Sequence, residues 1–230
     1  MSTGTRYPHS VRDEPRPVLV HSLMMQVLRP GSDNEKLGRR FKVGKFKNQE
    51  IWQLSLEEKG ESCPTYCEQW HNCYGNGMPF AARHRVNPTI LVAINQDLHT
   101  LDGRRRPYVV RLHVLGDFGS IMYVDYWQSM VNIHPLLYIW GYTHRRPDDP
   151  IGMAISRLVL NNPGRVSILR SDGVAGDVLP RAIVVRDWKE VPKGFVKCPE
   201  QLGVLDSCAS CGICCNGKSE VAFKIHGRSV

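Results

Sequence analysis

The chain contains no uninterrupted apolar run of about 18 residues, the length that a membrane-spanning helix needs. Its opening residues, MSTGTRYPHS, hold no apolar segment of the kind found in secretory signal peptides. Heptads, internal repeats and low-complexity tracts are missing as well. No Gly-x-Ser-x-Gly motif is present, which argues against a serine hydrolase of the α/β type. We therefore expect a protein of the cytoplasm that makes no use of a membrane.

The composition is that of an ordinary globular protein. The 230 residues are 42% hydrophobic and 23% charged, which is enough to bury one full core. Residues 1–35 are rich in proline, arginine, aspartate and serine, and we expect a loosely ordered arm whose apolar stretch 18–27 is compatible with one strand. We assign residues 36–190 to an α/β core that carries a first cysteine loop, and residues 191–230 to a cysteine-rich, metal-binding tail.

The core shows strands that alternate with helices. Helix starts are indicated by Asn87 before Pro88, by Ser120, and by Asp149 before Pro150, each followed by apolar residues at spacings of three and four. Strands are expected at 51–56, 108–115, 136–143, 166–169 and 182–185. Near-continuous apolar strands between helices predict a parallel sheet. About five strands are fewer than the eight of a closed barrel, so we expect a partial (β/α) barrel or an open α/β sheet.

Ligands of parallel α/β proteins bind at the carboxyl ends of the strands. Four segments follow predicted strands and should meet there. They are the first cysteine loop, Gly116-Asp117-Phe118, Thr143-His144-Arg145-Arg146, and residues 171–173.

The eight cysteines form two groups that are far apart in the chain. The first group is Cys63, Cys67 and Cys73, and the second is Cys198, Cys208, Cys211, Cys214 and Cys215. Disulfide frameworks are typical of small secreted domains, whereas closely spaced thiols in a chain of this size favour a metal centre in a reducing compartment. Thiolates are strong ligands for iron–sulfur clusters and for zinc.

Three cysteines around a [4Fe-4S] cluster leave one iron without a protein ligand. The loop from Cys63 to Cys73 resembles the Cys-x3-Cys-x2-Cys loop of radical S-adenosylmethionine (radical SAM) enzymes, with a longer gap after Cys67. In those enzymes the cluster donates an electron to SAM, whose amino group is held by a Gly-Gly-Glu turn. Gly116-Asp117 occupies the corresponding place. The alternatives are that this dipeptide turns the chain and caps the next helix, and that His71 supplies a fourth ligand.

The second group has the spacing of a four-thiolate site. Cys208-x2-Cys211-x2-Cys214 with a distant Cys198-Pro199 resembles bacterial ferredoxin ligation and predicts a second [4Fe-4S] cluster. Zinc uses the same four-thiolate geometry and stays an alternative. Cys215 is the expected spare cysteine, or else it replaces Cys214.

The formal charge of +8 and the pI near 9.2 suggest contact with nucleic acid. Three thiolates on a 2+ centre subtract one charge and four subtract two, so an excess of about +5 remains. The basic residues gather at 39–47, at Arg104-Arg105-Arg106 and at Arg145-Arg146.

Taken together, several segments resemble the bacteriophage gene product 88 family. They are Trp52 to Leu56, Ser62-Cys63-Pro64, Cys73-Tyr74, residues 111–118 with Tyr126-Trp127, Tyr138 to Thr143, and the tail from Cys208 to His226. The resemblance spans about residues 35–226 and implies a reduced relative of radical SAM barrels in the host cytoplasm.

Two functions follow as hypotheses. One is a radical SAM-like iron–sulfur enzyme with an auxiliary metal centre in the tail, in which SAM is bound by a set of residues near the first cluster. These are Gly116, Asp117, Tyr74 and Thr143. The other is a non-catalytic metalloprotein that binds nucleic acid or a host protein through its basic loops.

Overall fold

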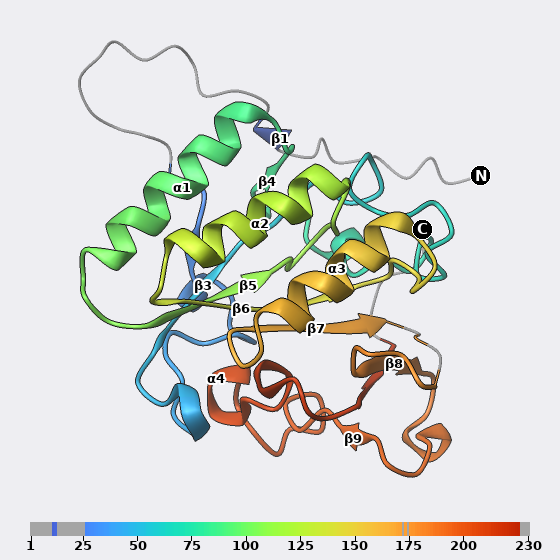
Figure 1. The fold of residues 1–230 in the computed structure, drawn as a ribbon. Helices are drawn as coiled ribbons and strands as arrows, with labels where there is room; N and C mark the ends of the chain where they lie inside the picture. Colours follow the sequence, from blue (N-terminus) through green and yellow to red (C-terminus); the bar gives the residue numbers. More distant parts are fainter. Residues whose placement is uncertain (1–10, 13–25, 172, 174, 226–230) are drawn as a thin grey trace.

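The computed structural model describes residues 11–12, 26–171, 173 and 175–225. Its centre is an eight-stranded sheet that is parallel except for the pairing of β2 with β3 (Figure 1). In spatial order the strands are β2 (Arg29–Pro30), β3 (Glu50–Gln53), β5 (Tyr108–Leu112), β6 (Leu137–Thr143), β7 (Val166–Ser171), β8 (Arg181–Val185), β10 (Val221–Lys224) and β9 (Val196–Lys197). A separate pair joins β1 (Val11–Arg12) to β4 (Arg83–His84). The predicted α/β class with a parallel sheet is confirmed.

The five predicted strands correspond to β3, β5, β6, β7 and β8, which are neighbours in that order. The sheet gains β10 and β9 from the tail, because β10 lies between β8 and β9 and is parallel to both. At the other end, β2 is antiparallel to β3, and the adjoining Val27 and Leu28 are buried in the core. Residues 18–25 of the apolar stretch 18–27 lie outside the described residues.

The three long helices begin where the capping residues predict. They are α1 (Pro88–Asp102), α2 (Ile121–Ile133) and α3 (Pro150–Asn161). The side chains of Asn87, Ser120 and Asp149 accept hydrogen bonds from the backbone N–H groups of Ile90, Tyr123 and Ile151 respectively. Within the described part of the chain, no helix has both the length and the apolar character needed to cross a membrane.

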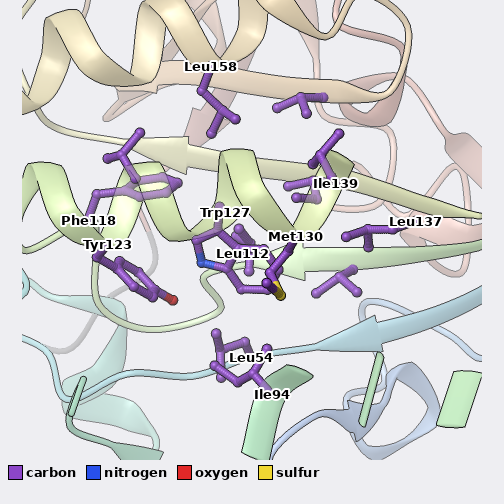
Figure 2. Packing of buried hydrophobic residues seen from close by; sticks show 14 of the residues in the cluster. Leu54, Ile94, Leu112, Phe118, Tyr123, Trp127, Met130, Leu137, Ile139 and Leu158 are labelled. Atoms are coloured by element: carbon purple, nitrogen blue, oxygen red, sulfur yellow. The ribbon is translucent and has the colours of Figure 1, made fainter. Parts of the chain in front are cut away.

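All three helices cover one face of the sheet (Figure 1). Alternate residues of β5 and β6, among them Leu112 and Ile139, point into a core that contains Ile94, Trp127 and Leu158 from the helices (Figure 2). This arrangement leaves the opposite face of the sheet to be covered by other segments.

The opposite face is covered by the segment 34–48 together with the tail. The tail carries the short helix α4 (Cys208–Cys211). Short 3-10 turns occur along the chain, at Gly31–Asp33, Gly44–Phe46, Tyr74–Gly77, Trp188–Glu190 and Cys214–Asn216. Phe41 and Ala209 pack with Val109 and Trp140 on this face. The backbone N–H of Cys208 donates to the Lys36 carbonyl at 2.7 Å, so the tail is bound to the segment 34–48.

Candidate functional site

A cavity of about 330 Å³ lies at the carboxyl end of the parallel strands. Its wall includes residues at or just beyond the ends of β5, β6, β7, β8 and β10, as expected for a ligand site in a parallel α/β fold. Thiols from both cysteine groups line it, and these are Cys63, Cys67, Cys73, Cys198 and Cys208. The structure therefore brings together two groups that are more than a hundred residues apart in the chain.

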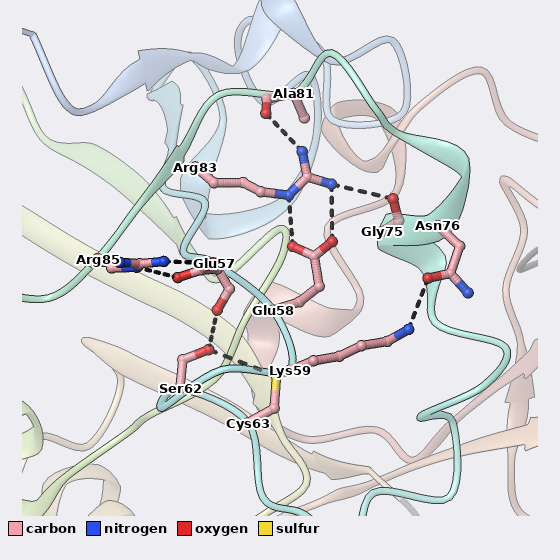
Figure 3. Close-up of polar contacts among 10 residues, drawn as sticks. All are labelled: Glu57, Glu58, Lys59, Ser62, Cys63, Gly75, Asn76, Ala81, Arg83 and Arg85. Atoms are coloured by element: carbon pink, nitrogen blue, oxygen red, sulfur yellow. Dashed lines mark hydrogen bonds and ion pairs between the residues drawn. The ribbon is translucent and has the colours of Figure 1, made fainter. Parts of the chain in front are cut away.

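The first cysteine loop is anchored by a buried ion pair between Glu58 and Arg83 (Figure 3). Arg83 Nε and Nη2 donate to the two carboxylate oxygens of Glu58 at 2.6 and 3.0 Å. Arg83 Nη2 also donates to the Gly75 carbonyl at 3.2 Å. A Cβ atom at Gly75 would lie 2.4 Å from Glu58 Oε1, so the turn after Cys73 requires glycine at this position. The pair thus fixes the segment that follows the third cysteine.

The sulfur atoms of this loop accept hydrogen bonds from the backbone. The N–H of Lys59 donates to Cys63, and the N–H of Gly75 donates to Cys73. Burial raises the pKa of Cys63 to about 11, and the nearby Asp117 carboxylate adds to the effect. Burial also raises the pKa of Cys73. Both thiols are therefore protonated at neutral pH, and a bound cation would be needed to hold them as thiolates.

Asp117 connects the ends of two neighbouring strands. One carboxylate oxygen accepts from the backbone N–H of Phe118 at 2.7 Å, and the other accepts from the N–H of His144 at 2.8 Å. Thr143 donates a further side-chain hydrogen bond to this carboxylate. Burial nevertheless raises the pKa of Asp117. Since Ser120 caps α2, Asp117 turns the chain after β5 and does not serve as the helix cap.

Two glycines let this turn approach the first cysteine loop. Gly116 has a φ of +80°, and a Cβ there would lie 2.7 Å from Leu56 Cβ. A Cβ at Gly119 would lie 2.8 Å from the Glu61 carbonyl oxygen. The turn after β5 therefore packs directly on the residues that lead into Cys63.

The buried Arg145 completes this attachment. Its Nε donates to the Phe118 carbonyl at 2.9 Å, and its Nη2 donates to the Ser62 carbonyl at 3.0 Å. The guanidinium thus joins the cysteine loop, the turn after β5 and the end of β6. Arg145 was predicted as part of a basic loop for nucleic acid, but its hydrogen bonds are made within the protein.

The thiols of the tail lie close to one another. Burial, together with neighbouring thiols of the same group, raises the pKa values of Cys208 and Cys214 to about 12. Backbone N–H groups of Glu200 and Gln201 donate to Cys198, whose pKa is raised by burial. The Tyr142 hydroxyl donates to the sulfur of Cys214. Cys198, Cys208 and Cys214 therefore resemble Cys63 and Cys73 in having a raised pKa.

Cys215 has different surroundings. It is 3% exposed and packs in an apolar cluster with Phe41, Phe46 and Trp140. Its pKa is raised by burial. Both residues have other tail thiols as electrostatic neighbours, namely Cys198 and Cys211 for Cys214, and Cys208 and Cys214 for Cys215.

Arg111 is a cavity residue that the sequence analysis did not single out. Its guanidinium stacks over Tyr142 at 4.5 Å and over Trp140 at 5.6 Å. Nη1 donates to the carbonyls of Leu112 and His113 at 2.6 and 2.8 Å. The sequence does hold a sign of this position, because Arg111 is the charged residue of the otherwise apolar strand Tyr108–Leu112. Side chains alternate between the two faces of a strand, which places Arg111 on the face away from the helices.

The remaining predicted residues fall into two sets. Tyr74 and Thr143 line the cavity, and the Lys36 ammonium lies 5.3 Å from the centre of the Tyr74 ring. His71 is exposed and does not line the cavity, and neither do Cys211 and Cys214. No three His, Cys, Asp or Glu side chains in the described residues are already gathered in the arrangement of a metal site.

The basic runs are largely engaged within the protein. Arg104 donates to Glu50 at 2.8 Å and stacks over Trp52. Lys42 pairs with Asp206 at 2.8 Å. Arg105 and Arg106 are exposed.

The fold and the cavity define a parallel α/β protein with helices on one face of its sheet and two groups of thiols at the carboxyl edge. The family model described as "Gene product 88" matches residues 25–150, more than half of the chain, and the chain belongs to this family.

Gene 88 protein of Mycobacterium phage L5 is 27% identical over 140 residues, which cover 53% of this chain and 56% of that protein. The chain thus spans little more than half the length of this relative. No solved structure matches. The family match contains the first cysteine group, Gly116 and Asp117, whereas the cysteine-rich tail lies beyond it. The predicted membership is confirmed, but the extension of the resemblance to residue 226 is not part of the match.

Proposed function

We propose that this protein is an iron–sulfur protein in which Cys63, Cys67 and Cys73 bind an open [4Fe-4S] cluster, and that it acts as a radical SAM-like enzyme. One observation carries the proposal. Three thiols and the Gly116-Asp117 turn line one cavity at the carboxyl edge of a parallel α/β sheet whose helices lie on one face.

The donor set suits such a cluster. Three thiols leave one coordination position free for a small molecule, and the N–H groups of Lys59 and Gly75 already donate to sulfur. Aromatic residues form part of the cavity wall, among them Trp70, Tyr74 and Tyr142. When bound and reduced, a cluster of this type supplies the electron that cleaves SAM at its sulfonium.

The residues around the cluster site would bind and orient SAM. Two N–H groups and Thr143 fix the Asp117 carboxylate, and its remaining lone pairs are available to accept from an amino group. Tyr74 and Thr143 lie on the same cavity wall. The aromatic side chains would exclude water from the bound molecule.

The tail would hold a second centre through Cys198, Cys208, Cys211 and Cys214. A [4Fe-4S] cluster and zinc both suit four thiolates. The apolar packing of Cys215, and the hydrogen bond that the Tyr142 hydroxyl donates to the sulfur of Cys214, favour Cys214 as the fourth ligand.

Metal analysis tests the cofactor proposal. Protein purified without oxygen should contain about eight irons if both centres are cubane clusters, or about four irons and one zinc if the tail binds zinc. Replacing Cys63, Cys67 and Cys73 together by serine should remove about four irons. Cys215→Ala is the matched control and should keep the full metal content. A colourless, metal-free wild-type protein would contradict the proposal.

The enzymatic proposal has its own test. Cluster-loaded protein reduced with dithionite should convert SAM into methionine and 5′-deoxyadenosine, and Asp117→Ala should lower that rate by at least about tenfold, as loss of a charged hydrogen bond implies. Full metal content without cleavage would favour the alternative, a non-catalytic metalloprotein. The alternative predicts salt-sensitive binding of nucleic acid that weakens when Arg104, Arg105 and Arg106 become alanine.

A further inference from the structure

Arg111, which is partly exposed and lines the cavity, has no acidic partner among the described residues. The three arginines that are buried among the described residues each have a carboxylate nearby: Arg83 pairs with Glu58, Arg170 with Asp177, and Arg145 lies 3.7 Å from Asp149. No carboxylate in the described part of the chain pairs with Arg111. Its Nε and Nη2 also make no hydrogen bond there, since both of its bonds come from Nη1.

An unpaired guanidinium in a largely apolar wall is unfavourable unless an anion compensates it. Trp140 and Tyr142 stack on Arg111, which lies on the face of the sheet opposite the helices. The same two rings contact the tail, because Trp140 packs with Cys208 and Cys215, and Tyr142 packs with Cys214. The nearest candidates for a compensating anion are therefore the tail thiols.

We propose that Arg111 is the countercharge of the metal–thiolate centre in the tail. This inference rests on the proposed tail centre. Four thiolates around a 2+ ion or cluster carry a net charge of about −2, which is costly to bury without a nearby cation. One guanidinium reduces this charge by half, and Tyr142 adds a hydrogen bond to the sulfur of Cys214. Arg111 is thus a positioning residue for the centre and not one of its ligands.

The countercharge has two measurable effects. Reduction of a cluster adds one negative charge, so a nearby cation favours the reduced form and raises the reduction potential. A cation also stabilises the bound, anionic form of the centre against loss of metal, and this second effect applies to zinc as well as to a cluster.

The experiment compares three substitutions at Arg111 in full-length protein whose first group is replaced by serine at positions 63, 67 and 73, so that only the tail centre contributes. Arg111→Gln and Arg111→Met remove the charge, and the methionine side chain keeps the packing between the two rings. Arg111→Lys keeps the charge. Arg104→Gln is the matched control, because Arg104 also stacks on a tryptophan, at 5.2 Å from Trp52, but pairs with Glu50.

For a cluster, Arg111→Gln and Arg111→Met should lower the reduced-to-oxidised ratio at a fixed potential about tenfold, which corresponds to about −59 mV for one electron. For zinc, the same variants should lose the metal at about tenfold lower chelator concentration. Arg111→Lys and Arg104→Gln should stay within about twofold of the parent.

Unchanged potential and chelator resistance in both neutral variants would overturn the role of Arg111 while leaving the tail centre intact. The role is also overturned if Arg111→Lys loses the centre as readily as Arg111→Met, because the charge would then not be the cause. A parent protein without any tail metal would instead refute the proposed centre itself, and that result is obtained before Arg111 is substituted.

Discussion

His113, which follows β5, is buried between aromatic rings. Its ring centre lies 4.9 Å from that of Phe118, and its Nε2 lies 3.0 Å from the Tyr123 hydroxyl. Burial, together with the positive charge of Arg111, lowers the pKa of His113 to about 3. Between pH 3 and pH 6.5 the imidazole is therefore mainly neutral in the folded protein and mainly protonated in the unfolded chain.

The first prediction concerns the pH dependence of stability. The unfolded histidine has a pKa near 6.5, so below that pH the unfolded state binds a proton that the folded state does not. The free energy of unfolding should decrease as the pH falls from 6.5 toward 3, by up to about 1.4 kcal/mol per pH unit from this residue. Urea unfolding at pH 7, 6, 5 and 4 measures the slope.

His113→Gln should flatten that slope, and the exposed His71→Gln should leave it unchanged. Equal slopes for the wild type and His113→Gln would show that another group is responsible.

The second prediction concerns the close contact at Gly119. Alanine there would place its Cβ 2.8 Å from a backbone oxygen of Glu61, which cannot move without displacing the residues before Cys63. We expect Gly119→Ala to cost about 1–3 kcal/mol of stability and to reduce the content of the iron that we propose for the first group. Gly77→Ala is the control, since a Cβ at Gly77 meets no atom within 4 Å. Equal iron content in the two variants would argue against the contact.

At the residue scale, the sequence predicts the roles of residues that depend on their own chemistry and on their near neighbours in the chain. The helix caps Asn87, Ser120 and Asp149 and the grouping of the cysteines could be read from the sequence alone. The roles of Arg111 and Arg145 could not. An arginine in a basic run looks the same whether it faces solvent or donates to a buried carbonyl, and only the tertiary fold decides between the two.

Among the elements, the segment from Glu57 to Arg85 depends on the buried pair of Glu58 and Arg83 (Figure 3). The third prediction is that Arg83→Met costs about 3–5 kcal/mol, because it leaves the Glu58 carboxylate buried without a partner. Adding Glu58→Gln should recover part of this loss, since the uncompensated charge is then removed. Chemical denaturation of the two single variants and the double variant measures the coupling. Additive losses would mean that the two residues do not act as a pair.

The elements that the sequence predicts well are the central ones. β3, β5, β6, β7 and β8 are apolar runs between helices, and this pattern depends only on neighbouring residues. β9 and β10 were not predicted. They are only two and four residues long, and no long helix separates them from β8 or from each other, so the alternation of strands and helices does not mark them. β5 also ends at Leu112, earlier than predicted, because Val114 and Leu115 hydrogen-bond instead to Leu54 and Leu56.

For the whole molecule, the main arrangement that the spacing of the cysteines does not predict is a single cavity lined by both cysteine groups. The sequence placed the first cysteine loop, Asp117 and Thr143 at one edge of the sheet, and the structure brings them together there. The sequence gives no sign that Cys198 and Cys208 line the same cavity, because the tail reaches it through the pairing of β10 with β8 and through its hydrogen bonds to the segment 34–48.

The fourth prediction is that apolar contacts hold the tail in place even without metal. Replacing Cys198, Cys208, Cys211 and Cys214 by serine removes the ligands of the proposed tail centre and should preserve the circular dichroism of the fold. Removal of residues 191–230 should instead expose Trp140 and Val109 and give a protein that binds hydrophobic dyes or aggregates. A four-serine variant that unfolds as fully as the truncated chain would mean that metal ligation, and not packing, keeps the tail in place.

The cavity lined by both cysteine groups also has a consequence for chemical modification of the thiols. Five sulfur atoms from two distant stretches of polypeptide face a single space. An alkylating reagent needs a thiolate, so at high pH it would react with whichever group ionises first. A bulky adduct on one group would then fill the space that the other group also lines, without any change in the backbone.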